Sequence, residues 1–248
     1  MQRRRKTFGA LAAGALARLA PLGLPLAAAG ATGCAPGTPK SAADAVTPTP
    51  ALRPPLTYAA LGASDAAGVG VEDPQRDGWV PVLSRQLPQP TRLVNLGIPG
   101  VRLFEAIEVE LAPALEVKPD LVTIWLVVND ILTGIPLDRY RADLDSLLAP
   151  LRSGTRARIA IGNVPNAPDS LPYLGLPPAE RRAVAATWNA AIAAAAAAHG
   201  ATLVDLYQRW PLTEHPEYIG ADRLHPTAPG YRALADVFRQ TLASERIV

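Results

Sequence analysis

A serine, an aspartate and a histidine in this chain have the types and spacing of a nucleophile with its base. Ser64 follows the apolar stretch 58–61 and has small residues around it. A serine at the end of a buried strand lies at the C-terminal edge of a sheet, where open α/β folds bind their ligands. His225 follows Asp222 by three residues. That spacing lets the carboxylate hold imidazole Nδ1 while Nε2 faces a serine hydroxyl.

Two further residues offer hydrogen bonds to a developing negative charge. Gly100 follows a second apolar stretch and presents a backbone N–H that no side chain obstructs, and Asn129 follows a third and carries an NH2 donor. Each feature alone has a structural interpretation, since Asn-Asp after a strand is usually a turn or a helix cap. Their joint occurrence favours catalysis. His215, which follows Glu214, is the alternative base.

Alternating strand and helix signals from residue 56 onward predict the scaffold that positions these side chains. The predicted strands are 56–61, 92–96, 121–128, 158–161 and 202–206, and the predicted helices are 79–87, 103–115, 137–151, 177–199 and 227–242. Such alternation is typical of a parallel sheet covered on both faces. With right-handed crossovers it gives a three-layer α/β/α sandwich around a central five-stranded sheet. Residues that follow its strands then converge on one edge.

Four blocks of this sequence resemble, in order, those of the SGNH (GDSL-type) hydrolases: Gly62-Ala63-Ser64, Asn95-Leu96-Gly97-Ile98-Pro99-Gly100, Val127-Val128-Asn129-Asp130 and Asp222-Arg223-Leu224-His225. The resemblance spans about residues 56–245. It implies a flavodoxin-like fold in which Ser64 is the nucleophile and Asp222 and His225 complete the triad. It also implies an oxyanion hole made by the N–H groups of Ser64 and Gly100 and by the Asn129 side chain, with no metal or cofactor.

The chain departs from that family's pattern at two places. Ala63 stands where the family usually has Asp, and Asp65 instead follows the serine; Val127 stands where the third block usually has Gly. Neither change removes a catalytic group, although Val127 adds bulk beside the oxyanion hole. The leading hypothesis is therefore an exported serine esterase acting on acyl or acetyl esters. The alternative is a catalytically weak or inactive binding lipoprotein that keeps the fold.

The first 33 residues have the features of an export signal. Arg3 to Lys6 form a positive start, which resembles a twin-arginine signal, and an Ala/Leu-rich stretch follows. Residues 31–34 resemble a lipobox, which implies cleavage before Cys34, lipid attachment to its thiol and anchoring in the membrane of the cell envelope. The alternative is ordinary cleavage near residues 27–29, which leaves a free thiol on a secreted protein.

Composition divides the chain further and excludes some functions. Residues 34–55, rich in Pro, Thr and Ala, predict an extended tether, which leaves 56–248 as the hydrolase domain. Without the leader, Lys+Arg fall from 24 to 19 against 22 Asp+Glu, a net charge of −3, so nucleic-acid binding has little support. Cys34 is the sole cysteine, which excludes an internal disulfide. Acetylated polysaccharides, lysophospholipids and small acyl esters all remain candidate substrates, and the oligomeric state carries no sequence signal.

Overall fold

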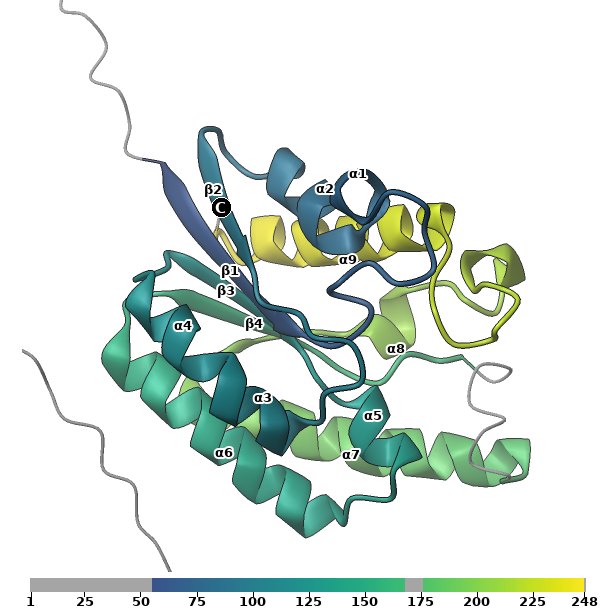
Figure 1. Ribbon diagram of the computed structural model, residues 1–248. Helices are drawn as coiled ribbons and strands as arrows, with labels where there is room; N and C mark the ends of the chain where they lie inside the picture. The colour runs from purple at the N-terminus through teal and green to yellow at the C-terminus, as the bar shows by residue number, and fades with distance from the viewer. Residues whose placement is uncertain (1–54, 168–175, 248) are drawn as a thin grey trace, which may run out of the picture. The chain divides into compact units, whose positions relative to one another are not determined.

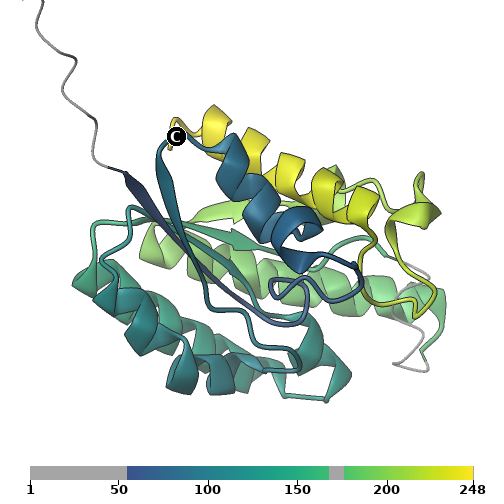
Figure 2. The same cartoon turned by 45° about the horizontal axis from the view of Figure 1, so that its top comes forward.

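A five-stranded parallel sheet lies between two layers of helices in the computed structural model, which describes residues 55–167 and 176–247 (Figures 1 and 2). The predicted export signal, Cys34 and nearly all of the tether fall outside the described residues. In the described part, no helix is both long and apolar enough to cross a membrane.

The sheet confirms the predicted fold class. Its strands are β1 (Leu56–Gly62), β2 (Thr91–Asn95), β3 (Leu121–Trp125), β4 (Arg158–Gly162) and β5 (Thr202–Val204). They lie in the order β2-β1-β3-β4-β5, and every neighbouring pair is parallel. The side chains of β3 are buried along its whole length, as expected for a strand covered on both faces.

Helices cover both faces of this sheet (Figure 1). One layer holds α1 (Pro74–Asp77), α2 (Trp79–Gln86) and α9 (Ala228–Ser244). The other holds α3 (Leu103–Val109), α4 (Leu111–Glu116), α6 (Leu137–Gly154) and α7 (Pro178–His199). Three short helices lie in connecting segments, namely α5 (Val128–Leu132), α8 (Leu206–Arg209) and η2 (Pro216–Tyr218).

Aromatic contacts join the helices within each layer. Trp79 of α2 stacks on Phe238 of α9 with ring centroids 4.6 Å apart, and Tyr140 of α6 meets Trp188 of α7 at 4.7 Å. The buried residues of α9 recur at helical spacing, which gives the helix one apolar stripe facing the sheet. Each large apolar side chain buried in this way contributes about 1.5–3 kcal/mol.

Two predicted elements differ in the structure. The third strand ends at Trp125, because Leu126 and Val127 leave the sheet while staying buried, and an apolar run does not distinguish these two situations. The predicted helix 103–115 is divided into α3 and α4 at Glu110. Pro113 has no N–H to donate to the preceding turn, which favours a break there.

Candidate active site

The chain reverses its direction of winding at β1, which pairs with β2 on one side and β3 on the other. Such switch points leave a crevice outside the carboxyl ends of the strands. Gly62, the last residue of β1, pairs with Trp125, the last residue of β3. Ser64 and Asn129 follow these two ends, so the fold brings them to one crevice.

The turn that carries Ser64 is held from two other elements. The Gly62 N–H donates to Glu110 Oε2 at 3.0 Å, and Asn95 Nδ2 donates to the carbonyl oxygen of Ala66 at 2.7 Å. Gly97 packs directly on this turn, since a Cβ built there would lie 2.6 Å from Ala66 Cβ. These contacts fix the serine from β2 and from the α3–α4 junction.

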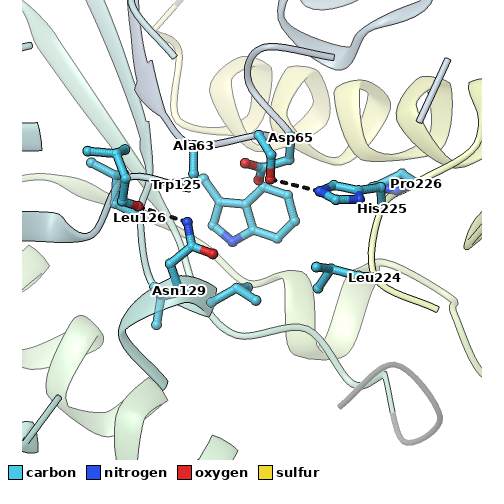
Figure 3. Close-up of a pocket in the computed structure, with 12 residues that line it drawn as sticks. Ala63, Asp65, Trp125, Leu126, Asn129, Leu224, His225 and Pro226 are labelled. Atoms are coloured by element: carbon cyan, nitrogen blue, oxygen red, sulfur yellow. Dashed lines mark hydrogen bonds between the residues drawn. The ribbon is translucent and has the colours of Figure 1, made fainter. Parts of the chain in front are cut away.

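His225 connects Ser64 to Asp222 through both ring nitrogens. Nε2 lies 2.9 Å from Ser64 Oγ, and Nδ1 lies 2.6 Å from Asp222 Oδ2 (Figure 3 draws the first contact as a dashed line). An ionised carboxylate only accepts hydrogen bonds, so Nδ1 carries the hydrogen and the neutral ring presents Nε2 to the hydroxyl as an acceptor. The geometry suits proton transfer from Ser64 to His225.

Asp222 is held in the ionised form that this arrangement needs. Its Oδ1 accepts the backbone N–H groups of Leu224 and His225, both at 3.0 Å. Partial burial opposes ionisation, but these hydrogen bonds and the one from the imidazole together lower the pKa of Asp222 below its usual value.

The alternative base, His215, lies elsewhere. Its Nδ1 is 2.8 Å from Glu217 Oε1, and its ring stacks on Tyr218 with centroids 4.6 Å apart. The imidazole hydrogen-bonded to Ser64 is that of His225.

Of the two predicted oxyanion donors outside the Ser64 turn, Asn129 lines the cavity and Gly100 does not. Asn129 lines the same cavity as Ser64 and His225, and its Nδ2 donates to the Val101 carbonyl oxygen at 2.8 Å. An amide NH2 has two hydrogens, so one remains for a ligand. Gly100 is exposed with a φ of 82°, and the lining includes its neighbour Val101 rather than Gly100 itself.

Comparison with known proteins places this site in a family. The sequence model of the GDSL-like lipase/acylhydrolase family matches residues 60–233, which contain every residue of the candidate site described above. The chain belongs to this family. A search of the curated proteins finds no match.

Solved structures share the fold of this GDSL-like chain at low sequence identity. The lipase/acylhydrolase from Enterococcus faecalis is 22% identical, with a TM-score of 0.63 over 77% of this chain and 96% of that one. TesA is 24% identical, with a TM-score of 0.65 over 77% and 99%. The psychrotrophic esterase EstA from Pseudoalteromonas sp., inhibited by monoethylphosphonate, is 20% identical, with a TM-score of 0.61 over 76% and 97%.

A second, apolar pocket adjoins the candidate catalytic cavity, the one lined by Ser64, His225 and Asn129, in this GDSL-like domain. The two share Trp125, Val128 and Leu224. The apolar pocket is completed by aliphatic side chains and an indole, among them Ile131, Val164, Trp210, Leu212 and Ile219. Its residues come from separate loops, and most of them read in the sequence as ordinary core positions.

Glu110, which accepts the N–H of Gly62 below the turn that carries Ser64, is a residue that sequence reasoning missed. It is fully buried, and its Oε1 has no hydrogen-bond partner among the described residues. Desolvation raises the pKa of Glu110 to about 8, so it is mostly protonated at neutral pH. Its position inside a predicted helix gave no sign of a contact with β1.

No group of three or more His, Cys, Asp or Glu side chains is arranged to hold a metal ion within residues 55–167 and 176–247.

Proposed function

We propose that this protein is a serine hydrolase of carboxylic esters. The observation that carries the proposal is the hydrogen-bonded series Asp222–His225–Ser64 at the switch point of the sheet. His225 Nε2 takes the proton of Ser64 as Oγ attacks the ester carbonyl. The imidazolium then gives that proton to the leaving alkoxide. Water, activated by the same imidazole, releases the acyl group from Ser64.

In this proposal the tetrahedral oxyanion is held by the N–H groups of Ser64 and Gly100 and by the second Nδ2 hydrogen of Asn129. Asn129 already has one hydrogen on the Val101 carbonyl, which fixes the direction of its amide. Donors oriented before the reaction stabilise developing charge without reorganisation, each by about 3–4 kcal/mol.

The apolar pocket supports an aliphatic acyl chain as the part of the substrate that enters the site. It meets the catalytic cavity at Trp125, Val128 and Leu224, so a chain attached to the attacked carbonyl can extend into it. Each buried methylene contributes about 0.8 kcal/mol. Among the candidate substrates, an acyl ester therefore fits better than an acetylated polysaccharide.

We also propose that the domain is exported and anchored to the membrane of the cell envelope by a lipid on Cys34. This rests on the sequence of residues 1–55 alone: the positive start, the lipobox-like residues 31–34 and the Pro-rich tether.

The test is hydrolysis of p-nitrophenyl acetate and butyrate by the full chain, with Ser64→Ala as the variant. We expect turnover to fall by at least about a thousandfold while cooperative unfolding is preserved. Ser146→Ala is the matched control, because Ser146 is exposed on α6 and bonds only within its helix. Turnover retained by Ser64→Ala would contradict the proposal.

The second candidate function is a binding lipoprotein without catalysis. It is favoured by Val127, a branched side chain in the lining of the cavity that is only 2% exposed. A fluorophosphonate probe separates the two functions, since it labels an activated serine covalently. Labelling lost in Ser64→Ala supports the esterase, and a folded wild-type protein that takes no label supports the binding protein.

A further inference from the structure

Asp65 places a second carboxyl group beside the proposed nucleophile. It directly follows Ser64 in a turn that three backbone hydrogen bonds close. The N–H groups of Ala67, Gly68 and Val69 donate in this order to the carbonyl oxygens of Ala63 (3.0 Å), Asp65 (3.1 Å) and Ser64 (2.9 Å). The turn fixes Asp65 relative to Ser64.

Asp65 is half-buried and belongs to the lining of the proposed catalytic cavity. It lines the cavity together with Ser64 and His225. Figure 3 shows the labelled Asp65 and His225 near each other, with Asn129 across the cavity. Ala63, on the other side of the serine, also lines this cavity but contributes only a methyl group and is 8% exposed. Asp65 is therefore the lining residue of this turn that brings a carboxyl group next to Ser64 and His225.

Among the titratable groups near Asp65, the His225 imidazole is the one whose charge acts on the Asp65 carboxyl. The charge of His225, from the loop before α9, acts on the Asp65 carboxyl and favours its ionised form. Glu110, from the α3–α4 junction, is mostly protonated at neutral pH because burial raises its pKa to about 8. Tyr231 of α9 keeps its proton, which it donates to the Val69 carbonyl oxygen at 2.6 Å. Asp222 contacts the other ring nitrogen of His225, since its Oδ2 lies 2.6 Å from Nδ1.

We propose that Asp65 is a positioning residue that acts through His225: its ionised carboxylate stabilises the imidazolium that forms when His225 takes the proton of Ser64. The inference rests on the proposed ester hydrolysis. The proton moves from Ser64 Oγ to His225 Nε2 as the Oγ–carbon bond forms, and then to the leaving alkoxide. Asp65 gains and loses no proton in these steps and acts by its charge.

This role has a pH signature that a structural role lacks. Burial raises the pKa of Asp65 to about 7, an increase that backbone hydrogen bonds within the turn and, after them, the charge of His225 partly offset. Below that pH the carboxyl is neutral and resembles an asparagine side chain in shape and charge. Above it the carboxylate is charged, and asparagine no longer replaces it.

The experiment compares kcat/KM of the full-length wild type and Asp65→Asn for p-nitrophenyl butyrate between pH 5 and 8.5. We expect a ratio near one at pH 5, which rises through pH 7 to about tenfold at pH 8.5, the effect of an interaction that shifts a pKa by one unit. Asp65→Glu keeps the charge and is expected to recover most of the loss at high pH. Asp145→Asn removes a charge from an exposed residue of α6 and should give a ratio near one throughout.

A ratio that is the same at all pH values overturns the proposal, even if it is large, because a structural defect has no reason to follow the ionisation of Asp65. If Ser64→Ala keeps full turnover, the proposed function fails instead, and the two failures are thus distinguishable.

A second measurement does not depend on turnover. The titration of the Asp65 carboxyl carbon is followed by NMR in the wild type and in His225→Gln. Coupling between two charges is reciprocal, so loss of the imidazole should raise the Asp65 midpoint above its wild-type value near 7. An unchanged midpoint overturns the proposal. This titration carries the test alone if Asp65→Asn does not unfold cooperatively.

Discussion

Gly70 and His225 approach each other so closely that a side chain at residue 70 has no room. A Cβ built on Gly70 would lie 3.0 Å from His225 Cβ and 2.8 Å from the carbonyl oxygen of Pro226. The backbone of Gly70 also has a φ of 101°, which L side chains rarely adopt. The segment after Ser64 thus packs directly on the backbone that carries the histidine, although the two are far apart in the sequence.

Gly70→Ala is expected to damage the site as well as the fold. The strained φ costs about 1–3 kcal/mol, and the contact with Pro226 pushes the histidine loop away from Ser64. A displacement of about 1 Å lowers kcat by about a hundredfold. The measurements are kcat/KM for p-nitrophenyl butyrate and urea unfolding.

Gly134→Ala is the matched control for Gly70→Ala. Gly134 also has a positive φ, of 72°, but a Cβ there meets no atom within 4 Å. It should lose a comparable amount of stability from strain and keep its activity. Equal activity of the two variants would contradict the role of the close approach.

Asp222→Asn should abolish most turnover without unfolding the protein. An amide at this position favours the wrong imidazole tautomer, so we expect kcat to fall by about 10³–10⁴-fold. Hydrogen bonds lower the pKa of Asp222 below its usual value, so the acid is ionised throughout pH 5–9 and the loss should be the same over that range. Glu217→Gln removes the similar carboxylate contact of His215 and should leave kcat within about twofold. A smaller loss for Asp222→Asn than for Glu217→Gln would contradict the assignment.

Glu110→Gln tests the buried acid under the nucleophile turn. The folded protein holds the Glu110 proton up to about pH 8, whereas the unfolded chain releases it near 4.5. The folded state therefore binds more protons between these values, and stability falls as pH rises through this window, by an amount on the order of a few kcal/mol. Gln mimics the neutral acid, so the variant should lose less stability than the wild type between pH 5 and 8.

Urea unfolding at pH 5, 6, 7 and 8 measures this difference. Glu116→Gln, at an exposed residue of the neighbouring helix α4, is the control and should follow the wild-type pH dependence. Parallel curves for Glu110→Gln and the wild type would show that the acid does not carry the effect.

Leu212→Phe should shorten the acyl chain that the site prefers. Leu212 lines the apolar pocket but not the catalytic cavity, so a larger ring occupies space at a distance from Ser64. Each methylene that loses its apolar contact costs about 0.8 kcal/mol, roughly fourfold in kcat/KM. We expect the rate ratio of hexanoate to acetate to fall by about tenfold or more, with acetate as the internal reference. An unchanged ratio would remove the pocket from substrate binding.

Much of the fold was open to prediction because its signals are local. The apolar runs and their spacing predicted a parallel five-stranded sheet, and the structure confirms it. The predictions failed where one signal fits two structures. The run 121–128 is apolar to its end, yet only the part up to Trp125 is strand. Glu110 sits in a helical pattern, which does not reveal that its carboxyl group accepts the N–H of Gly62 at the end of β1.

The sequence alone determined which groups are available for chemistry: a serine after the first strand, an Asp and a His three residues apart near the end, and donors after two other strands. Only the tertiary structure decided that His225 and not His215 meets Ser64, that Val101 and not Gly100 lines the cavity, and that Asp65 lines it beside Ser64 and His225. The physical reason is that residue type and spacing follow from the covalent chain. Distances between residues far apart in the chain depend on how strands and loops pack, as the close approach of Gly70 to His225 illustrates.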